Sequence, residues 1–199
     1  GDVNVNAVDE YRKINDRYTF LSEQRDDLLA AKEDLKTVIK DITITMEKRF
    51  KEEFAIINNY FGETFSELFG GGSAQLVLED EQDILSCGIE IIAQPPGKKL
   101  QSLSLLSGGE KALTAIAILF AILRHKPTPF CVLDEIDAAL DESNVYQFSS
   151  FIKDLSNSQF IIITHRKGTM EASDVMYGIA MEEKGISKLI SVKFEDMVS

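Results

Sequence analysis

The sequence predicts an α/β fold, a mostly parallel sheet flanked by helices, joined to a long coiled-coil helix. Three observations support this prediction: a heptad repeat over 11–46, two short apolar runs at 130–133 and 159–163, and helical patterns that alternate with those runs. Helices that alternate with buried strands are typical of parallel sheets. With 199 residues, 44% of them hydrophobic, the chain is long enough for one core with an appended helix.

The first element is a helix with a coiled-coil seam. Two sets of positions recur every seven residues: Tyr11, Tyr18, Arg25, Lys32, Ile39 and Met46, and Ile14, Leu21, Leu28, Leu35 and Ile42. This spacing specifies a left-handed coiled coil, and the charged positions Arg25 and Lys32 favour one register over indiscriminate pairing. The alternative is a surface helix packed on its own domain. However, about 35 residues of helix would reach roughly 50 Å, which exceeds a small domain.

A globular part follows the seam. Past Met46 the apolar period relaxes to that of a helix entering a core, and Gly70-Gly71-Gly72 ends this helix. The remaining elements are expected in this order: β-prone runs at 74–78 and 88–93 in a hairpin or meander, a loop at 95–99, a helix at 112–123, a strand at 130–133, a helix at 144–155, a strand at 159–163, and a closing hairpin of 175–181 with 188–194 that turns near Gly185. Because the strand at 130–133 is wholly apolar, we expect both of its faces to be buried.

The composition excludes several classes of function. A formal charge of −12 and a pI near 4.6 argue against this chain alone binding a nucleic-acid backbone, which needs clustered Lys and Arg. Cys87 and Cys131 lack metal-type spacing, as is typical of a reduced chain. No apolar run approaches the ~18 residues that span a bilayer, so we expect a cytoplasmic protein with no membrane partner. Gly1 in place of Met suggests processing or a piece of a longer polypeptide.

Polar residues follow both apolar strands: Asp134-Glu135 after the first and Thr164-His165 after the second. In open α/β sheets, ligands bind beyond the carboxyl ends of the strands. An apolar strand followed by Asp-Glu is the layout of a nucleotide hydrolase, in which the first carboxylate holds Mg²⁺, usually through water, and the second orients or deprotonates an attacking water. His165 at the same edge is suited to contact a γ-phosphate oxygen. The alternatives are an ordinary strand-end turn and a histidine satisfied at a strand end.

The triplet Ser107-Gly108-Gly109 precedes a long apolar helix. The unpaired amides and the dipole of a helix N-terminus favour an anion there. Ser107 and Glu110 also have the spacing of a capping box, and both functions can coexist because they use different amides. His125, at the far end of the helix, is interpreted as part of a favourable charge cluster without a role in the site. No Gly-x-x-x-x-Gly-Lys-Ser/Thr loop occurs, so the sequence predicts only half of a nucleotide site.

Four motifs in this order resemble those of ABC-type ATPases: a signature motif at 106–110, a Walker B strand at 132–135, a D-loop at 139–141 and a switch histidine at 164–165. Within that superfamily the chain is similar to the C-terminal head lobe of structural maintenance of chromosomes (SMC) proteins, most of all those of bacterial condensin. The runs that carry this resemblance are PPGKK at 95–99, LSGGEKA at 106–112, DEIDAALD at 134–141 and THRKGTM at 164–170. ABC transporters fit less well, since Pro-Thr usually follows their Walker B glutamate and Ile136-Asp137 follows here.

The resemblance implies a role for each site residue. Glu135 is expected to be the general base, His165 the γ-phosphate contact and Asp134 the carboxylate on the magnesium side. The remaining positions, Ser107, Gly108, Gly109 and Asp141, are implied to lie at the junction with a second head and to bind the ATP that the second head holds. ATP and Mg²⁺ are thus the expected cofactors, and ATP joins two heads until hydrolysis releases them.

The resemblance also implies the organisation of the whole protein. Residues 1–60 are expected to be the arm or neck of an antiparallel coiled coil, and 61–199 the C-terminal ATPase lobe. The expected partners are the N-terminal Walker A lobe of the same protein, a second SMC head in a homodimer, a ScpA-like kleisin subunit, and DNA through the assembled complex. ATP hydrolysis is expected only in that assembly, which would serve chromosome condensation and segregation at the nucleoid.

Three points stay open at this stage. The kleisin surface is either the neck at 11–60 or the closing hairpin at 175–194. The head of a related DNA-repair ATPase is an alternative, disfavoured because the PPGKK and THRKGTM runs match SMC proteins better. A structural kleisin-docking module without turnover is another, disfavoured by the intact Glu135.

Overall fold

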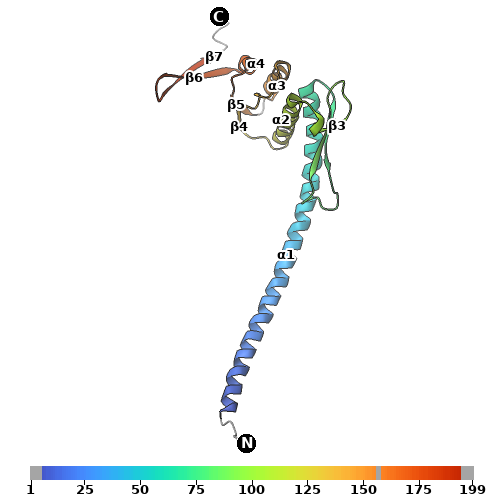
Figure 1. Cartoon of the computed structure of the whole chain (residues 1–199), viewed down its shortest axis with the longest axis vertical. Coiled ribbons are helices and arrows are strands. Elements are labelled where there is room, and N and C mark those ends of the chain that lie inside the picture. Colours follow the sequence, from blue (N-terminus) through green and yellow to red (C-terminus); the bar gives the residue numbers. More distant parts are fainter. Residues whose placement is uncertain (1–5, 156–157, 194–199) are drawn as a thin grey trace. The chain divides into compact units, whose positions relative to one another are not determined.

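Two compact units make up the chain in the computed structural model, which describes residues 6–155 and 158–193. The first unit extends to Lys51 and the second begins at Glu52. The boundary falls inside α1 (Ala7–Phe69), the long helix drawn in blue to green in Figure 1. The predicted division after residue 60 lies in the same helix and stays a prediction.

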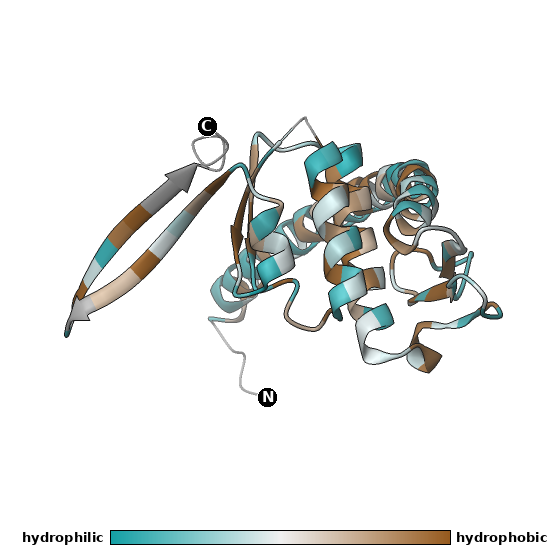
Figure 2. Cartoon of the chain, turned by 90° about the horizontal axis from the view of Figure 1, so that it is seen from above, coloured by the Kyte–Doolittle hydropathy of each residue, from teal (hydrophilic) through white to brown (hydrophobic). Residues whose placement is uncertain are grey.

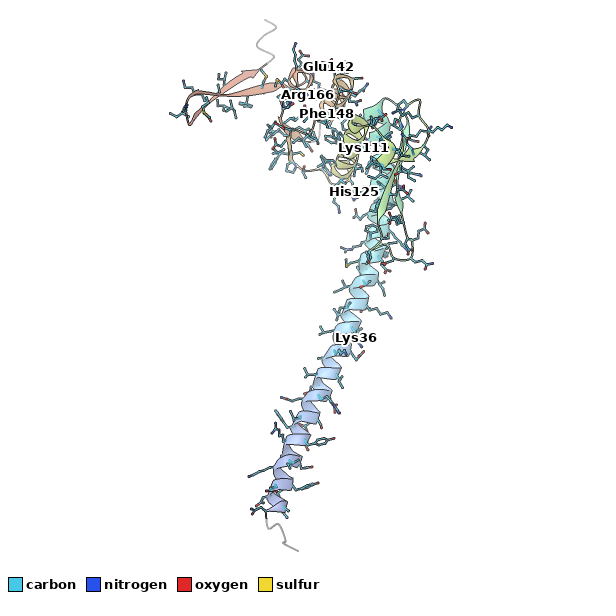
Figure 3. All side chains as sticks on the ribbon, viewed as in Figure 1. Lys36, Lys111, His125, Glu142, Phe148 and Arg166 are labelled. Carbon is cyan, nitrogen blue, oxygen red and sulfur yellow. The ribbon has the colours of Figure 1, made fainter. Side chains whose placement is uncertain are left out.

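The first unit is helical up to Lys51, and neither glycine nor proline interrupts its helix. The apolar seam positions are exposed: Tyr11, Ile14, Tyr18, Leu21, Leu28, Leu35, Ile39, Ile42 and Met46. Polar positions pair locally, as Lys36 does with Glu33 at 2.7 Å (Figure 3). An open apolar seam is what a coiled-coil helix presents to a partner helix. In the described part of the chain, no helix is both long and apolar enough to cross a bilayer.

The second unit begins with the end of α1 and an antiparallel meander. Gly70, Gly71 and Gly72 follow the helix with φ of +66°, +136° and +83°, a conformation that glycine adopts without strain. Strand β1 (Ser73–Leu78) pairs antiparallel with β2 (Ile89–Gln94), and β3 (Gln101–Ser102) also pairs antiparallel with β2. The predicted glycine stop and meander are therefore confirmed.

The motif-bearing elements follow. A 3₁₀ turn, η1 (Leu103–Leu105), leads into α2 (Gly108–His125). Then come β4 (Phe130–Asp134), α3 (Glu142–Asp154), β5 (Gln159–Ile163) and α4 (Lys167–Glu171). β4 and β5 are parallel, in register from Phe130↔Gln159 to Asp134↔Ile163, and α3 is the crossover helix that such a pair requires. Their carboxyl ends therefore meet at one edge, as predicted.

One hydrophobic core stabilises the second unit. The ring of Phe120 lies 5.1 Å from that of Phe151, 5.8 Å from Phe160 and 6.3 Å from Phe148, which is labelled in Figure 3. The largest fully buried hydrophobic side chains come from α1, α2, α3 and the turn before α3: Phe61, Phe65, Leu68, Leu113, Phe120, Leu140 and Phe148. Burying each one stabilises the fold by about 1.5–3 kcal/mol before conformational entropy is counted.

The prediction that the strand at 130–133 is buried on both faces is wrong for this chain. Phe130 and Val132 of β4 are 58% and 52% exposed, and Ile161 and Ile163 of β5 are 47% and 53% exposed. Because side chains alternate along a strand, the same strands still place Cys131, Leu133, Phe160 and Ile162 in or against the core. A parallel sheet is ordinarily covered on both faces, and here the described residues cover only one. We call the bare side the open sheet face, made of Phe130, Val132, Ile161 and Ile163.

The chain closes with the predicted hairpin. β6 (Val175–Glu183) and β7 (Ile186–Lys193) pair antiparallel around a turn in which Gly185 has φ of +86°. Residue 194 of the predicted hairpin lies outside the described residues. Hydrophobic and hydrophilic segments alternate along both strands in Figure 2. The α/β class is confirmed, with β4 and β5 as the parallel pair and antiparallel pairing in the other two sheets.

Candidate functional site

Glu135 and His165 lie together where the parallel strands end. The Glu135 N–H donates to the carbonyl of Ile163 at 2.9 Å and so continues the pairing of the two strands by one step. His165 Nδ1 then lies 3.9 Å from Glu135 Oε1, and both side chains are about two-thirds exposed, at 67% and 63%. With Asp134, the last residue of β4, they form the strand-end cluster. The parallel register brings the predicted catalytic pair to one exposed edge.

Glu135 has a backbone conformation that is rare for a residue with a side chain. Its φ is +47°, and it is the one non-glycine residue with positive φ in the part of the chain that the structure describes. A tight turn follows, in which the Ala138 N–H donates to the Glu135 carbonyl at 3.0 Å. Left-handed backbone costs a residue such as Glu roughly 1–2 kcal/mol, and strain of this kind concentrates at functional sites.

Asp134 is the predicted magnesium-side carboxylate. It is exposed, and among the described residues its carboxylate has no hydrogen-bond or ion-pair partner. Groups of three or more potential metal ligands are absent from the described residues. A protein-built cage is not what Mg²⁺ requires, because this ion commonly takes one or two carboxylates and completes its shell with water and substrate phosphates. The exposed carboxylate of Asp134 is suited to supply one such oxygen ligand.

A buried carboxylate links the two halves of the strand-end cluster, and the sequence interpretation assigned it no role. Asp137 is fully buried in the turn after Glu135. Its Oδ2 accepts from the Thr164 hydroxyl at 2.6 Å and from the Thr169 hydroxyl at 2.5 Å. The Thr164 hydroxyl oxygen in turn accepts from the Arg166 N–H at 2.9 Å. Asp137 therefore fixes the segments on both sides of His165 against the turn that carries Glu135.

Arg166 adds a second tie across the same turns. Its guanidinium donates to the carbonyl of Ala138 at 2.6 Å, and it is labelled in Figure 3. Asp137 Oδ1 and Arg166 Nε are buried without a hydrogen-bond partner among the described residues. A hydroxyl residue directly after an apolar strand, with an aspartate after the neighbouring strand, is the signal that could have found this network. The sequence interpretation used Asp137 only to recognise the family, within the DEIDAALD run and as a difference from transporters.

The start of α2 holds the other predicted residues. Ser107 is the N-cap residue, with extended backbone, and the capping box with Glu110 is present. The Glu110 carboxylate accepts from the Ser107 N–H at 3.0 Å and from the Ser107 hydroxyl at 2.7 Å. A Cβ built on Gly108 would meet no atom within 4 Å, so the space in front of this residue is open. The Glu110 carboxylate thus holds the Ser107 amide, and the space at Gly108 is open.

Asp141 lies beside this helix start. A Cβ on Gly109 would be 3.5 Å from Asn144 Nδ2, 3.7 Å from the Ala139 carbonyl and 4.0 Å from Asp141 Oδ2. Asp141 itself is the N-cap of α3, and its Oδ1 accepts from the Asn144 N–H at 2.8 Å. We call Ser107, Gly108, Gly109 and Asp141 the helix-start cluster. Within the described residues, no hydrogen bond or ion pair joins it to the strand-end cluster.

Comparison with known proteins identifies the family and the fold of this chain. The chain matches the family described as RecF/RecN/SMC N terminal domain over residues 8–188. The chromosome partition protein Smc of Bacillus subtilis (strain 168) is 57% identical over 197 residues, which cover 98% of this chain. They cover 17% of that protein, so the chain spans a small part of the relative it matches.

Solved structures share the fold. One, described as structural biochemistry of ATP-driven dimerization and DNA stimulated activation of SMC ATPases, aligns with a TM-score of 0.70 at 43% identity and covers 76% of this chain and 92% of that chain. Another is an Smc head domain with an extended coiled coil, bound to the C-terminal domain of ScpA and derived from Pyrococcus furiosus. It aligns with a TM-score of 0.70 at 41% identity and covers 96% of this chain and 48% of that chain.

Proposed function

This chain belongs to the RecF/RecN/SMC family, and from that membership we propose that it is one lobe of an SMC ATPase head that works only with a Walker A lobe and a second head. The family description names an N terminal domain. The assignment to the C-terminal lobe rests on the order of the motifs, with the signature triplet at 107–109 ahead of the Walker B strand and no phosphate-cradling loop.

The observation that carries the proposal is the strand-end cluster. A carboxylate and an imidazole 3.9 Å apart occupy the open edge of a parallel strand pair, where α/β folds bind their ligands. Glu135 would take a proton from the attacking water, and His165 would contact an oxygen of the γ-phosphate. Mg²⁺, when bound, would offset the negative charge of the phosphates, and Asp134 would hold it through water.

The helix-start cluster supports a role in trans. The first amides of α2 and the open space at Gly108 form a place where a phosphate can approach. The chain has no loop that would hold a nucleotide of its own. We therefore propose that Ser107, Gly108 and Gly109 bind the ATP held by the opposite head, with Asp141 at the same junction.

The open sheet face supports the need for a second lobe. Phe130, Val132, Ile161 and Ile163 are all about half exposed, which is unusual for the parallel strands of an α/β fold. This chain also corresponds to only 17% of its Bacillus subtilis relative, so further segments are present in such proteins. We propose that the Walker A lobe of the same polypeptide covers this face and supplies the remaining strands of the sheet.

Further partners are proposed from the relatives. The Pyrococcus furiosus head was solved with the C-terminal domain of ScpA, so a ScpA-like kleisin is proposed for this chain as well, on either the neck or the closing hairpin. DNA contact is proposed for the assembled complex, because the net charge of −12 disfavours it for this chain alone. The proposed role is chromosome condensation and segregation in the cytoplasm, at the nucleoid.

The decisive experiment compares ATP turnover by this chain alone with turnover by the chain assembled with its Walker A lobe. We expect none from the chain alone. In the assembled head, turnover should rise more than linearly with protein concentration, because two heads must meet around ATP. Turnover by the isolated chain would contradict the split site. Stable assembly without any turnover would favour the docking-module alternative.

Variants in the two clusters separate ATP hydrolysis from engagement of the heads. Glu135→Gln should end hydrolysis but leave ATP-dependent head dimers visible by sedimentation, because only the base is lost. Gly108→Asp should end dimerisation, because it places a negative charge where the phosphate would bind. An acidic residue in the first turn favours a helix, so this variant should be as stable to heat as the wild type.

Gly108→Ala is the uncharged control, and Ser107→Arg should block the same surface sterically. Normal ATP-dependent dimers of Gly108→Asp and Ser107→Arg would rule out the trans role.

A further inference from the structure

Lys98 is held in a defined position beside the start of α2. It lies in the loop between β2 and β3, where Gly97 has φ of +74° and the Lys98 N–H donates to the Pro95 carbonyl at 3.0 Å. The Gln94 side-chain amide donates to the Lys98 carbonyl at 3.1 Å. The backbone on both sides of the Lys98 side chain is thereby fixed, and its ammonium reaches the first turn of α2.

The partner of this ammonium is Glu110. Lys98 Nζ lies 2.8 Å from Glu110 Oε1 and 2.9 Å from Oε2. The Oε2 atom also accepts from the Ser107 N–H and hydroxyl, so one carboxylate receives donors from the loop and from the cap of α2. The hydrogen bond from Lys98, followed by those from Ser107, holds the pKa of Glu110 below its ordinary value despite partial burial. Glu110 is therefore ionised at neutral pH.

Glu110 is a negative charge at the start of α2, and Lys98 is the positive charge beside it. A carboxylate at the third position of a helix satisfies the cap, but it also places a negative charge beside amides that are proposed to bind a phosphate. The Glu110 carboxylate and a phosphate bound at these amides are both negative. At such short range like charges repel strongly when water is partly excluded, as it would be between two engaged heads. We propose that Lys98 is a positioning residue of the engagement surface, which neutralises Glu110 so that the start of α2 can accept the phosphate of the opposite head. This inference rests on the proposed function.

The test uses ATP turnover by the full-length protein, measured as kcat/KM for ATP at low salt. Lys98→Gln should lower it about tenfold, because the Glu110 charge is then uncompensated. Lys98→Arg keeps the charge and should stay near the wild type. The double variant Lys98→Gln/Glu110→Gln should recover to within about twofold of the wild type, because Gln at this helix position also completes a capping box.

A matched control lies next to Lys98. Lys99 is exposed in the same loop, and it has no ion pair or hydrogen bond among the described residues. Lys99→Gln removes the same charge from the same loop and should leave kcat/KM unchanged. The defect of Lys98→Gln should also shrink as salt is raised, because screening weakens the repulsion by Glu110. A folding defect would not recover in this way.

The outcomes separate this inference from the proposed function. If the Gly108→Asp variant turns over ATP as fast as the wild type, the proposed function itself is contradicted. If Gly108→Asp does end turnover, the proposed function stands, and either of two results would overturn only the inference about Lys98. One is normal kcat/KM for Lys98→Gln. The other is a double variant that stays as slow as Lys98→Gln, which would indicate direct contact between Lys98 and the phosphate.

Discussion

Glu135 combines a proposed catalytic role with a strained backbone. Its N–H is paired with the Ile163 carbonyl across the two strands, yet its φ of +47° is one that only glycine adopts without strain. A glycine would relieve the strain but would have no carboxylate. The residue that the proposed chemistry requires is therefore not the residue that the local backbone favours.

This conflict predicts opposite effects of one substitution on stability and turnover. Glu135→Gly should raise the free energy of unfolding by about 1 kcal/mol relative to Glu135→Ala, since alanine keeps the strain. Both variants should lose ATP turnover in the assembled head. Urea denaturation of the pair measures the difference. Equal stability of the two would show that the turn does not hold residue 135 in a left-handed conformation.

Asp137 is the second residue whose importance appears only in the fold. One of its two carboxylate oxygens, Oδ2, accepts two hydrogen bonds. One comes from the hydroxyl of Thr164, next to His165, and the other from the hydroxyl of Thr169 in α4. The two threonines offer a matched comparison, because each donates one short hydrogen bond to the same atom. Only Thr164 adjoins His165, the proposed γ-phosphate contact.

We predict that Thr164→Val and Thr169→Val each lower the free energy of unfolding by about 1–2 kcal/mol, because each removes one donor from a buried carboxylate. Thr164→Val should also lower kcat of the assembled head several-fold more than Thr169→Val, since it releases His165. Chemical denaturation and steady-state kinetics provide the two readouts. A similar loss of kcat in both variants would indicate that the network acts through stability alone.

At the scale of elements, α2 is anchored at both ends. Its start is tied to the β2–β3 loop through Lys98 and Glu110. Its end is tied to the last part of α1: Arg124 donates to Glu67 at 3.1 Å, and His125 Nε2 contacts Glu53, which Lys126 approaches at 3.5 Å. Figure 3 labels Lys111 and His125 near the two ends of this helix. The charge cluster predicted at its C-terminus is thus a set of contacts to α1.

The anchor at His125 predicts a defined pH dependence. The hydrogen bond with His125 lowers the pKa of Glu53, with a smaller contribution from Lys126. A carboxylate with a lowered pKa contributes stability above its ordinary pKa, and the contribution is lost as the pH falls through the lower value of the folded state. Glu53→Gln should therefore have a lower urea midpoint than the wild type at neutral pH.

The difference between Glu53→Gln and wild type should disappear as the pH falls below the ordinary glutamate value of 4.5. Glu52→Gln is the control, because the neighbouring Glu52 is exposed and makes no hydrogen bond or ion pair among the described residues. Glu52→Gln should follow the wild type at every pH. A Glu53→Gln midpoint equal to the wild-type midpoint at neutral pH would mean that this contact does not anchor α2.

At the scale of the molecule, apolar surface is exposed where partners are proposed. The seam of the first unit, the open sheet face and the outer residues of the β6–β7 hairpin such as Ile179 all carry large exposed hydrophobic side chains. Extended apolar patches on a soluble chain commonly mark interfaces. Each unit exposes apolar side chains of its own, as expected if each one binds a different partner segment.

The open sheet face predicts a change in dye binding. A dye that fluoresces on apolar surface should bind the isolated chain, and addition of the Walker A lobe should reduce the signal as the face is covered. Val132→Asn with Ile161→Asn should lower the signal of the isolated chain and weaken assembly with the lobe. Ile179→Asn on the hairpin is the control and should leave assembly unchanged. Equal assembly by all variants would place the lobe elsewhere.

The sequence by itself determined the features that depend on neighbours along the chain. The heptads of 11–46, the stop at Gly70-Gly71-Gly72, the capping box of Ser107 and Glu110 and the turn at Gly185 all follow from local spacing, and the structure contains the helix, the cap and the turns that these patterns predict. The site residues could be named because they adjoin such elements. The family resemblance followed from their order.

Only the tertiary structure decided which of these residues meet. The contact between Glu135 and His165 depends on β4 and β5 being adjacent and parallel, and the buried network of Asp137 depends on α4 returning to the turn after β4. The open sheet face was not predicted, because an apolar strand has the same sequence whether or not a second layer covers it. Local spacing specifies elements, whereas contacts between distant residues depend on how the whole chain packs.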